Sequence, residues 1–155
     1  AAVWDVPVRC AKADQEMLTR PSAGLGTRLV PLIRQLLGED LLERPADLRD
    51  HEVFQVPCGL EIRPHIAPGH TPGSTLLEVE DDTGKVLLTG DVIFRGTIGR
   101  TDLPGGDLEQ MRITLRRIVE TFPDETVLLP GHGEPTTVGT EKLHNPYLQA
   151  DFLKD

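Results

Sequence analysis

The chain has 155 residues, of which 38% are hydrophobic and 26% are charged, and its formal net charge is -9. This length and apolar content are enough for one domain with a core of ordinary size, so we expect a single domain over residues 1–155. The negative average field repels phosphate backbones and anionic membrane surfaces, which argues against nucleic acid and membranes as partners. No apolar run approaches the roughly 20 residues of a membrane span, and the opening residues lack the order of a signal peptide, so a cytoplasmic location is expected.

The first residues of the chain contain β-prone side chains and one of the two cysteines. Residues 3–8 predict a strand that has no lead-in or cap, and the chain begins without Met, as a processed terminus or a cloned segment also would. Cys10 and Cys58 have no CxxC spacing and are too few for a disulfide framework. We therefore expect two reduced thiols in the core.

Leucine and isoleucine side chains recur at helical spacing before Gly38, and this pattern predicts a helix over residues 24–37. A polar, acidic stretch over residues 39–50 then predicts a connector or a short helical turn. Two β-prone segments follow at 51–56 and 60–66, and the Pro-Cys-Gly sequence between them predicts a hairpin.

The middle of the chain predicts a second hairpin and then a helix. Residues 75–80 and 85–89 are β-prone, and the Asp-Asp-Thr-Gly sequence between them is a strong turn signal. Two further strands are expected after this hairpin. From Asp107 onward apolar residues recur every three or four positions until Pro123, which predicts an amphipathic helix with Asp107 as its N-cap.

The last part of the chain predicts a short strand and a helical tail. Residues 126–129 form an apolar run that leads directly into the sequence Pro-Gly-His-Gly. The tail from Thr140 has a helical pattern with a break at Pro146, because proline cannot continue a helix interior.

Three polar residues follow apolar strands, and each lies in a loop rich in glycine or proline. They are His70 in PGHTPGS, Asp91 at the end of VLLTGD, and His132 in LLPGHG. Imidazole and carboxylate groups suit zinc or iron, although each residue alone is more simply read as a loop histidine bonded to backbone or an aspartate capping a turn. Together, three such residues at strand ends predict an open metal site at one edge of a sheet.

The motifs PGHTPGS, TGDVIF followed by GRTDLPGGD, and LLPGHGEPT occur in an order that resembles the metallo-β-lactamase superfamily over about residues 53–148. The resemblance implies a mixed α/β fold, a four-layer αββα sandwich with metal at the sheet edges. It also implies that His70 binds one metal, that Asp91 bridges two and has the catalytic role of holding the pair together, and that His132 binds the other. Two zinc ions are expected in a complete enzyme, and iron is an alternative.

The remaining ligands of that family come from an H-x-H-x-D-H motif, which is not present in this sequence. The other histidines are isolated from one another and do not replace the motif; they are His51, His65 and His144. We therefore interpret the chain as the C-terminal portion of such a fold, incomplete at its N-terminus. Each metal would have two protein ligands where catalytic zinc usually has three, so the chain alone is expected to bind metal weakly or not at all.

The sequence GRTD, with the GGD that follows, is similar to the glyoxalase II-like (hydroxyacylglutathione hydrolase-like) and persulfide dioxygenase branches of the family. Arg100 is a candidate substrate-binding residue because a guanidinium can hold a carboxylate with two parallel hydrogen bonds. The alternative, to which we give more weight, is a structural ion pair with Asp102 that fixes the loop.

Three functions are consistent with these residues. The first is a metal-dependent hydrolase that attacks a thioester, such as a hydroxyacyl-glutathione, with a metal-activated water. The second is an iron-dependent persulfide dioxygenase of the same fold. The third is a metal-free fragment or a non-catalytic binding module. The expected partner is a small-molecule thioester, with glutathione as a candidate for its thiol part. The sequence does not decide between a monomer and a homodimer.

Overall fold

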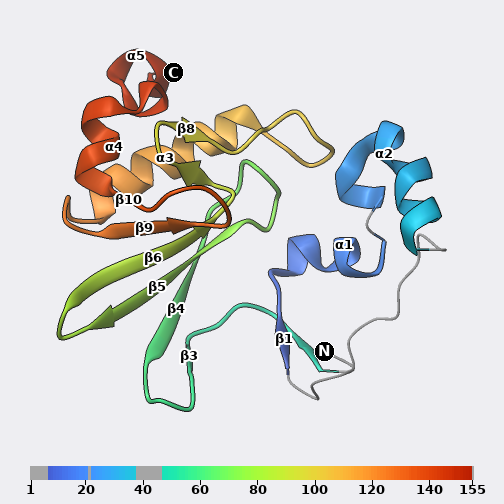
Figure 1. Cartoon of the computed structure of the whole chain (residues 1–155), viewed down its shortest axis with the longest axis horizontal. Coiled ribbons are helices and arrows are strands. Elements are labelled where there is room, and N and C mark those ends of the chain that lie inside the picture. Colours follow the sequence, from blue (N-terminus) through green and yellow to red (C-terminus); the bar gives the residue numbers. More distant parts are fainter. Residues whose placement is uncertain (1–6, 21, 38–46, 155) are drawn as a thin grey trace.

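The computed structural model describes residues 7–20, 22–37 and 47–154. Its central element is a six-stranded sheet with the strand order β10-β9-β6-β5-β4-β3 (Figure 1). Neighbouring strands are antiparallel except for β6 and β9, which run parallel. The strands are β3 (Phe54–Gln55), β4 (Glu61–Ile66), β5 (Thr75–Asp81), β6 (Gly84–Gly90), β9 (Val127–Pro130) and β10 (Thr136–Thr137).

One face of this sheet is covered by the helices α3 (Leu108–Thr121), α4 (Val138–His144) and α5 (Ala150–Leu153), with the short 3-10 helix η2 (Pro146–Leu148) between the last two (Figure 1). The carboxylate of Asp107 accepts hydrogen bonds from the backbone N–H groups of Glu109 and Gln110, so the predicted N-cap of α3 is confirmed. Met111, Leu115 and Ile118 of α3 are buried against Leu76, Leu87 and Leu128 of the sheet. This helix-facing side is the core of the protein.

The opposite face of the sheet is also apolar, but it is less buried. Leu77, Leu88 and Leu129 are paired across β5, β6 and β9 on this face. Leu88 remains 40% exposed, and the other two side chains are half-buried. The two faces of one sheet therefore differ in how completely they are covered.

Two smaller sheets and an N-terminal helical segment complete the described structure. The strands β7 (Ile93–Phe94) and β8 (Thr97–Ile98) form an antiparallel hairpin, and β1 (Val8–Arg9) pairs in parallel with β2 (Leu48–Arg49). The segment between β1 and β2 contains the 3-10 helix η1 (Lys12–Asp14) and the helices α1 (Gln15–Thr19) and α2 (Ser22–Leu37). In Figure 1 these helices lie beside the main sheet and apart from α3–α5.

Both predicted hairpins are confirmed, since β3 pairs with β4 and β5 pairs with β6 in antiparallel register. The predicted helix over 24–37 corresponds to α2, but the helix begins at Ser22 and is kinked where Gly26 adopts a φ of 67°. Its expected apolar face is exposed: Leu29, Leu32 and Leu36 are 40%, 50% and 72% exposed. Helical spacing of leucine thus predicted the helix without predicting its burial.

Other predictions fall at the ends of the described ranges or need correction. Within the predicted strand over 3–8, only the start of β1 is described, and most of the predicted connector at 39–50 lies outside the described residues. The helical tail begins at Val138, two residues before the predicted start, with Thr137 as its N-cap. No helix among the described residues is long and apolar enough to cross a membrane.

The prediction that both cysteines are core thiols is wrong. Both are free thiols, but Cys58 is exposed and Cys10 is half-buried. Cys58 lies in the turn of the β3–β4 hairpin, where the chain reverses at the surface and has no core to enter. Burial raises the pKa of the Cys10 thiol, and the nearby carboxylates of Asp14 and Asp50 raise it further, so Cys10 is a protonated thiol near neutral pH.

Candidate metal centre

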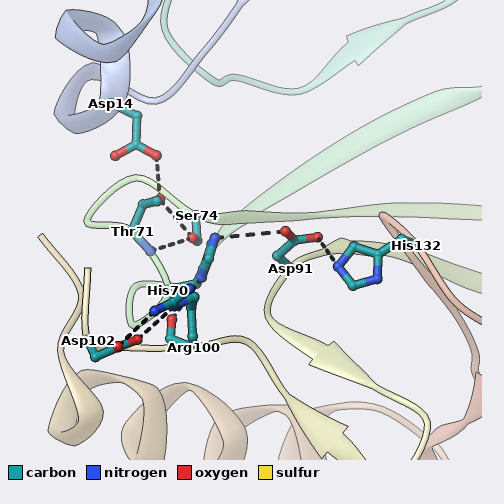
Figure 2. A network of polar contacts seen from close by, with 8 residues as sticks. All are labelled: Asp14, His70, Thr71, Ser74, Asp91, Arg100, Asp102 and His132. Atoms are coloured by element: carbon teal, nitrogen blue, oxygen red, sulfur yellow. Dashed lines mark hydrogen bonds and ion pairs between the residues drawn. The ribbon is translucent and has the colours of Figure 1, made fainter. Parts of the chain in front are cut away.

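His70 lies in the loop between β4 and β5, and its imidazole has a defined orientation. Its Nδ1 donates a hydrogen bond to the backbone carbonyl oxygen of Arg100, at 2.8 Å. This bond places the proton on Nδ1 and leaves the lone pair of Nε2 facing the carboxylate of Asp91 (Figure 2). A carbonyl bonded to the distal nitrogen is the usual support for a metal-binding histidine.

Asp91 directly follows β6, and glycine residues allow the turn that presents its carboxylate. Gly90 has a φ of 50°, in the left-handed region that favours glycine. The buried Thr89 hydroxyl donates to the carbonyl oxygen of Ile93 at 3.0 Å, which closes the turn around Asp91. A Cβ on Gly131 would lie 2.7 Å from Oδ1 of Asp91, so a side chain at this position would displace the carboxylate. The carboxylate therefore lies between two loops.

His132 follows β9, and its ring stacks on Phe94 of the β7–β8 hairpin, with 4.5 Å between the ring centroids and an interplanar angle of 26°. The loop is held to the Asp91 turn by a 2.8 Å hydrogen bond from the backbone N–H of Gly131 to the carbonyl oxygen of Gly90. The His132 side chain is 74% exposed, whereas that of His70 is 22% exposed. One histidine is thus held inside the loop cluster and the other lies open to solvent.

The structure brings the three predicted residues together at one edge of the sheet. The Nε2 atom of His70 lies 3.8 Å from Oδ2 of Asp91, and the Nε2 atom of His132 lies 3.8 Å from Oδ1. Figure 2 shows Asp91 between the two rings, with one carboxylate oxygen toward each. Two donor atoms that share a tetrahedral zinc ion at about 2.1 Å are about 3.4 Å apart, so a small side-chain adjustment suits each pair to one ion.

The three residues fit part of a dinuclear centre. Because Asp91 separates the rings, each pair supplies two donors to a different position, and a bridging carboxylate between two histidines has the donor chemistry for two ions. Among residues 7–20, 22–37 and 47–154, no group of three or more His, Cys, Asp or Glu side chains is arranged to hold one metal ion. The donor types and orientation fit zinc or iron, and the donor number at each position is short of three.

The geometry of Arg100 favours its structural interpretation. Its Nε and Nη2 atoms donate to the two carboxylate oxygens of Asp102, each at 2.8 Å. Hydrogen bonding from Arg100 lowers the pKa of Asp102 to about 2. The side chain thus already holds a carboxylate of its own loop, while its backbone carbonyl orients His70. Sequence reasoning identified the residue but missed the role of its main chain.

A cleft of about 440 Å³ opens beside the three predicted ligands. His70, Asp91 and His132 line it together with apolar side chains from the β7–β8 hairpin, Phe94 and Ile98. The two arginines in its wall are both paired, Arg100 with Asp102 and Arg95 with Glu134. The cleft therefore presents apolar surface next to the edge where His70, Asp91 and His132 meet.

A second cavity of about 390 Å³ reaches the same edge from the N-terminal segment. His70 and Asp91 line it, and so does His51, which sequence reasoning treated as isolated. Burial lowers the pKa of His51, and its buried Nδ1 has no hydrogen-bond partner within the described part of the chain. The other two isolated histidines do not line either cavity, and His65 instead bonds to Glu78 at 2.5 Å.

The sequence profile described as the Metallo-beta-lactamase superfamily matches residues 1–132. The chain therefore belongs to the metallo-β-lactamase superfamily. It is 36% identical over 154 residues to the probable metallo-hydrolase YqgX of Bacillus subtilis, covering 97% of this chain and 67% of YqgX. It is 45% identical over 84 residues to the hydroxyacylglutathione hydrolase GloC of Haemophilus influenzae, covering 54% of this chain and 38% of GloC.

Solved structures show the same fold. The B3 metallo-β-lactamase BLEG-1 is 28% identical with a TM-score of 0.74, over 96% of this chain and 68% of that one. TTHA1623, solved in a di-iron-bound form, is 31% identical with a TM-score of 0.68, over 95% and 67%. These likenesses confirm the predicted fold class. The chain spans about two thirds of the length of the curated relatives it matches, 65% for Rv2581c of Mycobacterium tuberculosis.

Proposed function

We propose that this chain supplies His70, Asp91 and His132 to the metal centre of a metal-dependent hydrolase. The hydrolase would act on a thioester such as a hydroxyacyl-glutathione. The observation that carries the proposal is the position of Asp91 between the Nε2 atoms of His70 and His132, at 3.8 Å from each. The partial similarity to GloC, whose name gives hydroxyacylglutathione as its substrate, supports the thioester.

Each of the three side chains has a separate task in this proposal. His70 would hold one metal through Nε2, His132 would hold the other, and Asp91 would hold both through its two oxygens. When bound, such a centre supplies a water nucleophile near neutral pH and polarises the carbonyl group under attack. The protein's own contribution is to keep the carboxylate and both rings at one point of the cleft wall, so that little reorganisation is needed when substrate binds.

The cleft supports an acyl group as the part of the substrate that lies beside this edge. Phe94 and Ile98 offer apolar contact to the carbon chain of the acyl group, and its carbonyl carbon would lie close to Asp91. The guanidinium groups of Arg95 and Arg100 are already paired with carboxylates. Recognition of an anionic glutathione tail is therefore assigned to surfaces other than these two side chains.

The test uses the gene product as the cell makes it, loaded with zinc or with iron, and this chain alone in parallel. The metal-loaded gene product is expected to release thiol from S-lactoylglutathione. The rate should fall at least about 100-fold in Asp91→Ala, because both metals lose a ligand. A chelator should abolish it, and this chain alone should show no turnover. Thiol release that survives both Asp91→Ala and the chelator would overturn the proposal.

An iron-dependent persulfide dioxygenase of the same fold is the second candidate, and the di-iron-bound form of TTHA1623 supports iron as the metal of such a site. Oxygen consumption with glutathione persulfide, measured on the iron-loaded gene product, distinguishes it from hydrolysis. Oxygen consumption with glutathione persulfide, in a protein that releases no thiol from S-lactoylglutathione, would replace the thioesterase proposal with this one. Hydrolysis of a β-lactam, the reaction named by the BLEG-1 likeness, serves as a third arm of the same assay.

A further inference from the structure

Asp14, in the N-terminal segment, contacts the loop that carries His70 although 57 residues separate it from Thr71. Its Oδ2 atom accepts a hydrogen bond from the hydroxyl of Thr71 at 2.5 Å, and its Oδ1 atom accepts one from the backbone N–H of Gly73 at 2.7 Å. Figure 2 shows the carboxylate above the loop, on the side of His70 away from Arg100. Both of its oxygens are therefore used to hold one short loop.

The loop is shaped to admit this carboxylate. Gly73 is buried, and a Cβ at that position would lie 2.6 Å from Cγ of Asp14. Because a carboxylate only accepts hydrogen bonds, the Thr71 hydroxyl must donate to Asp14. That hydroxyl oxygen then accepts from Ser74 Oγ at 2.8 Å, and Ser74 Oγ accepts from the backbone N–H of Thr71 at 3.0 Å. Asp14 thus sets the direction of the hydrogen bond between the Thr71 and Ser74 hydroxyl groups.

The other end of the loop is held by α3. The hydroxyl of Thr114 donates to the carbonyl oxygen of Pro68 at 2.7 Å, and the backbone N–H of Asp107 donates to the carbonyl oxygen of Gly69 at 2.8 Å. These bonds fix the residues before His70, whereas Asp14 fixes the residues after it. The His70 backbone is consequently bracketed from two sides, and its ring makes one further bond, to the carbonyl of Arg100.

We propose that Asp14 is a positioning residue for His70. By holding Thr71 and Gly73 it keeps the imidazole in line with the Arg100 carbonyl, which fixes the Nδ1–H tautomer and points Nε2 at Asp91. The N-terminal segment therefore acts on the metal-binding edge through one carboxylate, without supplying a ligand itself. The inference rests on the proposed function only in taking His70 as a metal ligand.

The experiment compares Asp14→Ala, Asp14→Asn and a matched control, Asp50→Asn, by ¹⁵N NMR of the metal-free chain. Asp50, directly after β2, also accepts two backbone hydrogen bonds, but from Lys12 and His51, which lie outside the loop. The wild type and the control are expected to show His70 as the Nδ1–H tautomer. Asp14→Ala should mix the two tautomers and raise the exchange rate of the Gly73 amide at least tenfold, because loop opening no longer breaks two hydrogen bonds.

Asp14→Asn keeps one acceptor oxygen for Gly73 and should give an intermediate tautomer mixture, so it decides the question if Asp14→Ala fails to fold. A faster Gly73 exchange with an unchanged His70 tautomer would reduce Asp14 to a structural contact and overturn the inference. So would the same tautomer change in Asp50→Asn. A zinc titration of the gene product as the cell makes it, run in parallel, tests the metal role: an absent response there contradicts the proposed function, while the tautomer of the metal-free chain still decides the role of Asp14.

Discussion

The two faces of the six-stranded sheet have similar apolar composition and very different burial. On the helix-facing side Leu76, Leu87 and Leu128 are fully buried beneath α3, whereas on the other side Leu88 stays 40% exposed. The candidate metal centre lies at one edge of the sheet, and its His70 loop is held from the helix side by Thr114 and Asp107 and from the N-terminal side by Asp14. Within residues 7–20, 22–37 and 47–154, the buried core therefore lies mainly on one face of the sheet, while the candidate site depends on contacts from both sides.

The largest expected effect tests this asymmetry directly. Leu115→Ala removes a fully buried side chain from the helix-facing core and should cost about 2–5 kcal/mol of unfolding free energy. Leu88→Ala makes the same chemical change on the other face and should cost about 1 kcal/mol or less, since much of the side chain is already in water. Urea unfolding of both variants gives the two values. Equal losses would show that the faces contribute alike.

The next effect concerns the helical layer behind the cleft. The carboxylate of the buried Glu141 accepts from Gly96 N at 2.8 Å, Thr136 Oγ1 at 2.6 Å and Asn145 Nδ2 at 2.8 Å, which ties α4 to the β7–β8 hairpin. Glu141→Gln keeps one oxygen for Gly96 and Asn145 and can turn its amide nitrogen toward the Thr136 hydroxyl, but it removes the charge that strengthens all three hydrogen bonds, and it should cost about 1–3 kcal/mol in the same urea assay.

Glu134→Gln is the matched control for that substitution, because it is an exposed residue in an ion pair with Arg95. It should cost no more than about 1 kcal/mol. If the two Glu→Gln changes proved equally mild, the buried carboxylate would not be what holds the cleft wall in place.

The carboxyl group of Glu78, on the helix-facing side of the sheet, should make the unfolding free energy depend on pH. Burial raises the pKa of Glu78, but hydrogen bonds from Lys85 and His65 outweigh burial, so its pKa is below the ordinary value. A lowered pKa adds stability that is present above the unfolded-state value of about 4.3 and is lost as pH falls through the lower folded value. The unfolding free energy should therefore decline in acid, and Glu78→Gln should flatten that decline. An unchanged acid limb in the variant would count against this pairing.

The smallest stability effect is expected at the site edge itself. Arg100→Ala removes an exposed ion pair and should leave the unfolding free energy nearly unchanged, because solvent screens such a pair. The pKa of Asp102 should rise from about 2 toward its ordinary value, measured by NMR titration of its carboxyl group. The His70 bond to the Arg100 main chain should persist. Loss of the His70 Nδ1–H tautomer in this variant would mean that the side chain, and not only the carbonyl, positions the ring.

Much of the large sheet, α3 and the position of the site was predictable from the sequence, because each depends on local signals. The Asp-Asp-Thr-Gly turn fixes one hairpin and Asp107 caps α3, while glycines beside His70, Asp91 and His132 mark loops at strand ends. The exposure of Leu36 and Cys58 was not predictable, since burial depends on which elements pack together. Asp14 was also missed, because a contact across 57 residues leaves no pattern in the sequence around it.

The central claim is that Asp91 links two metal positions, each of which has too few protein ligands in this chain. The most direct test is a calorimetric titration of this chain with zinc. Each position has two protein donors, His70 with Asp91 and His132 with Asp91, where catalytic zinc usually has three. We predict weak binding that disappears in Asp91→Ala and persists, weakened, in His132→Ala. Tight stoichiometric binding by this chain alone, or zinc binding that is unchanged in Asp91→Ala, would contradict the account.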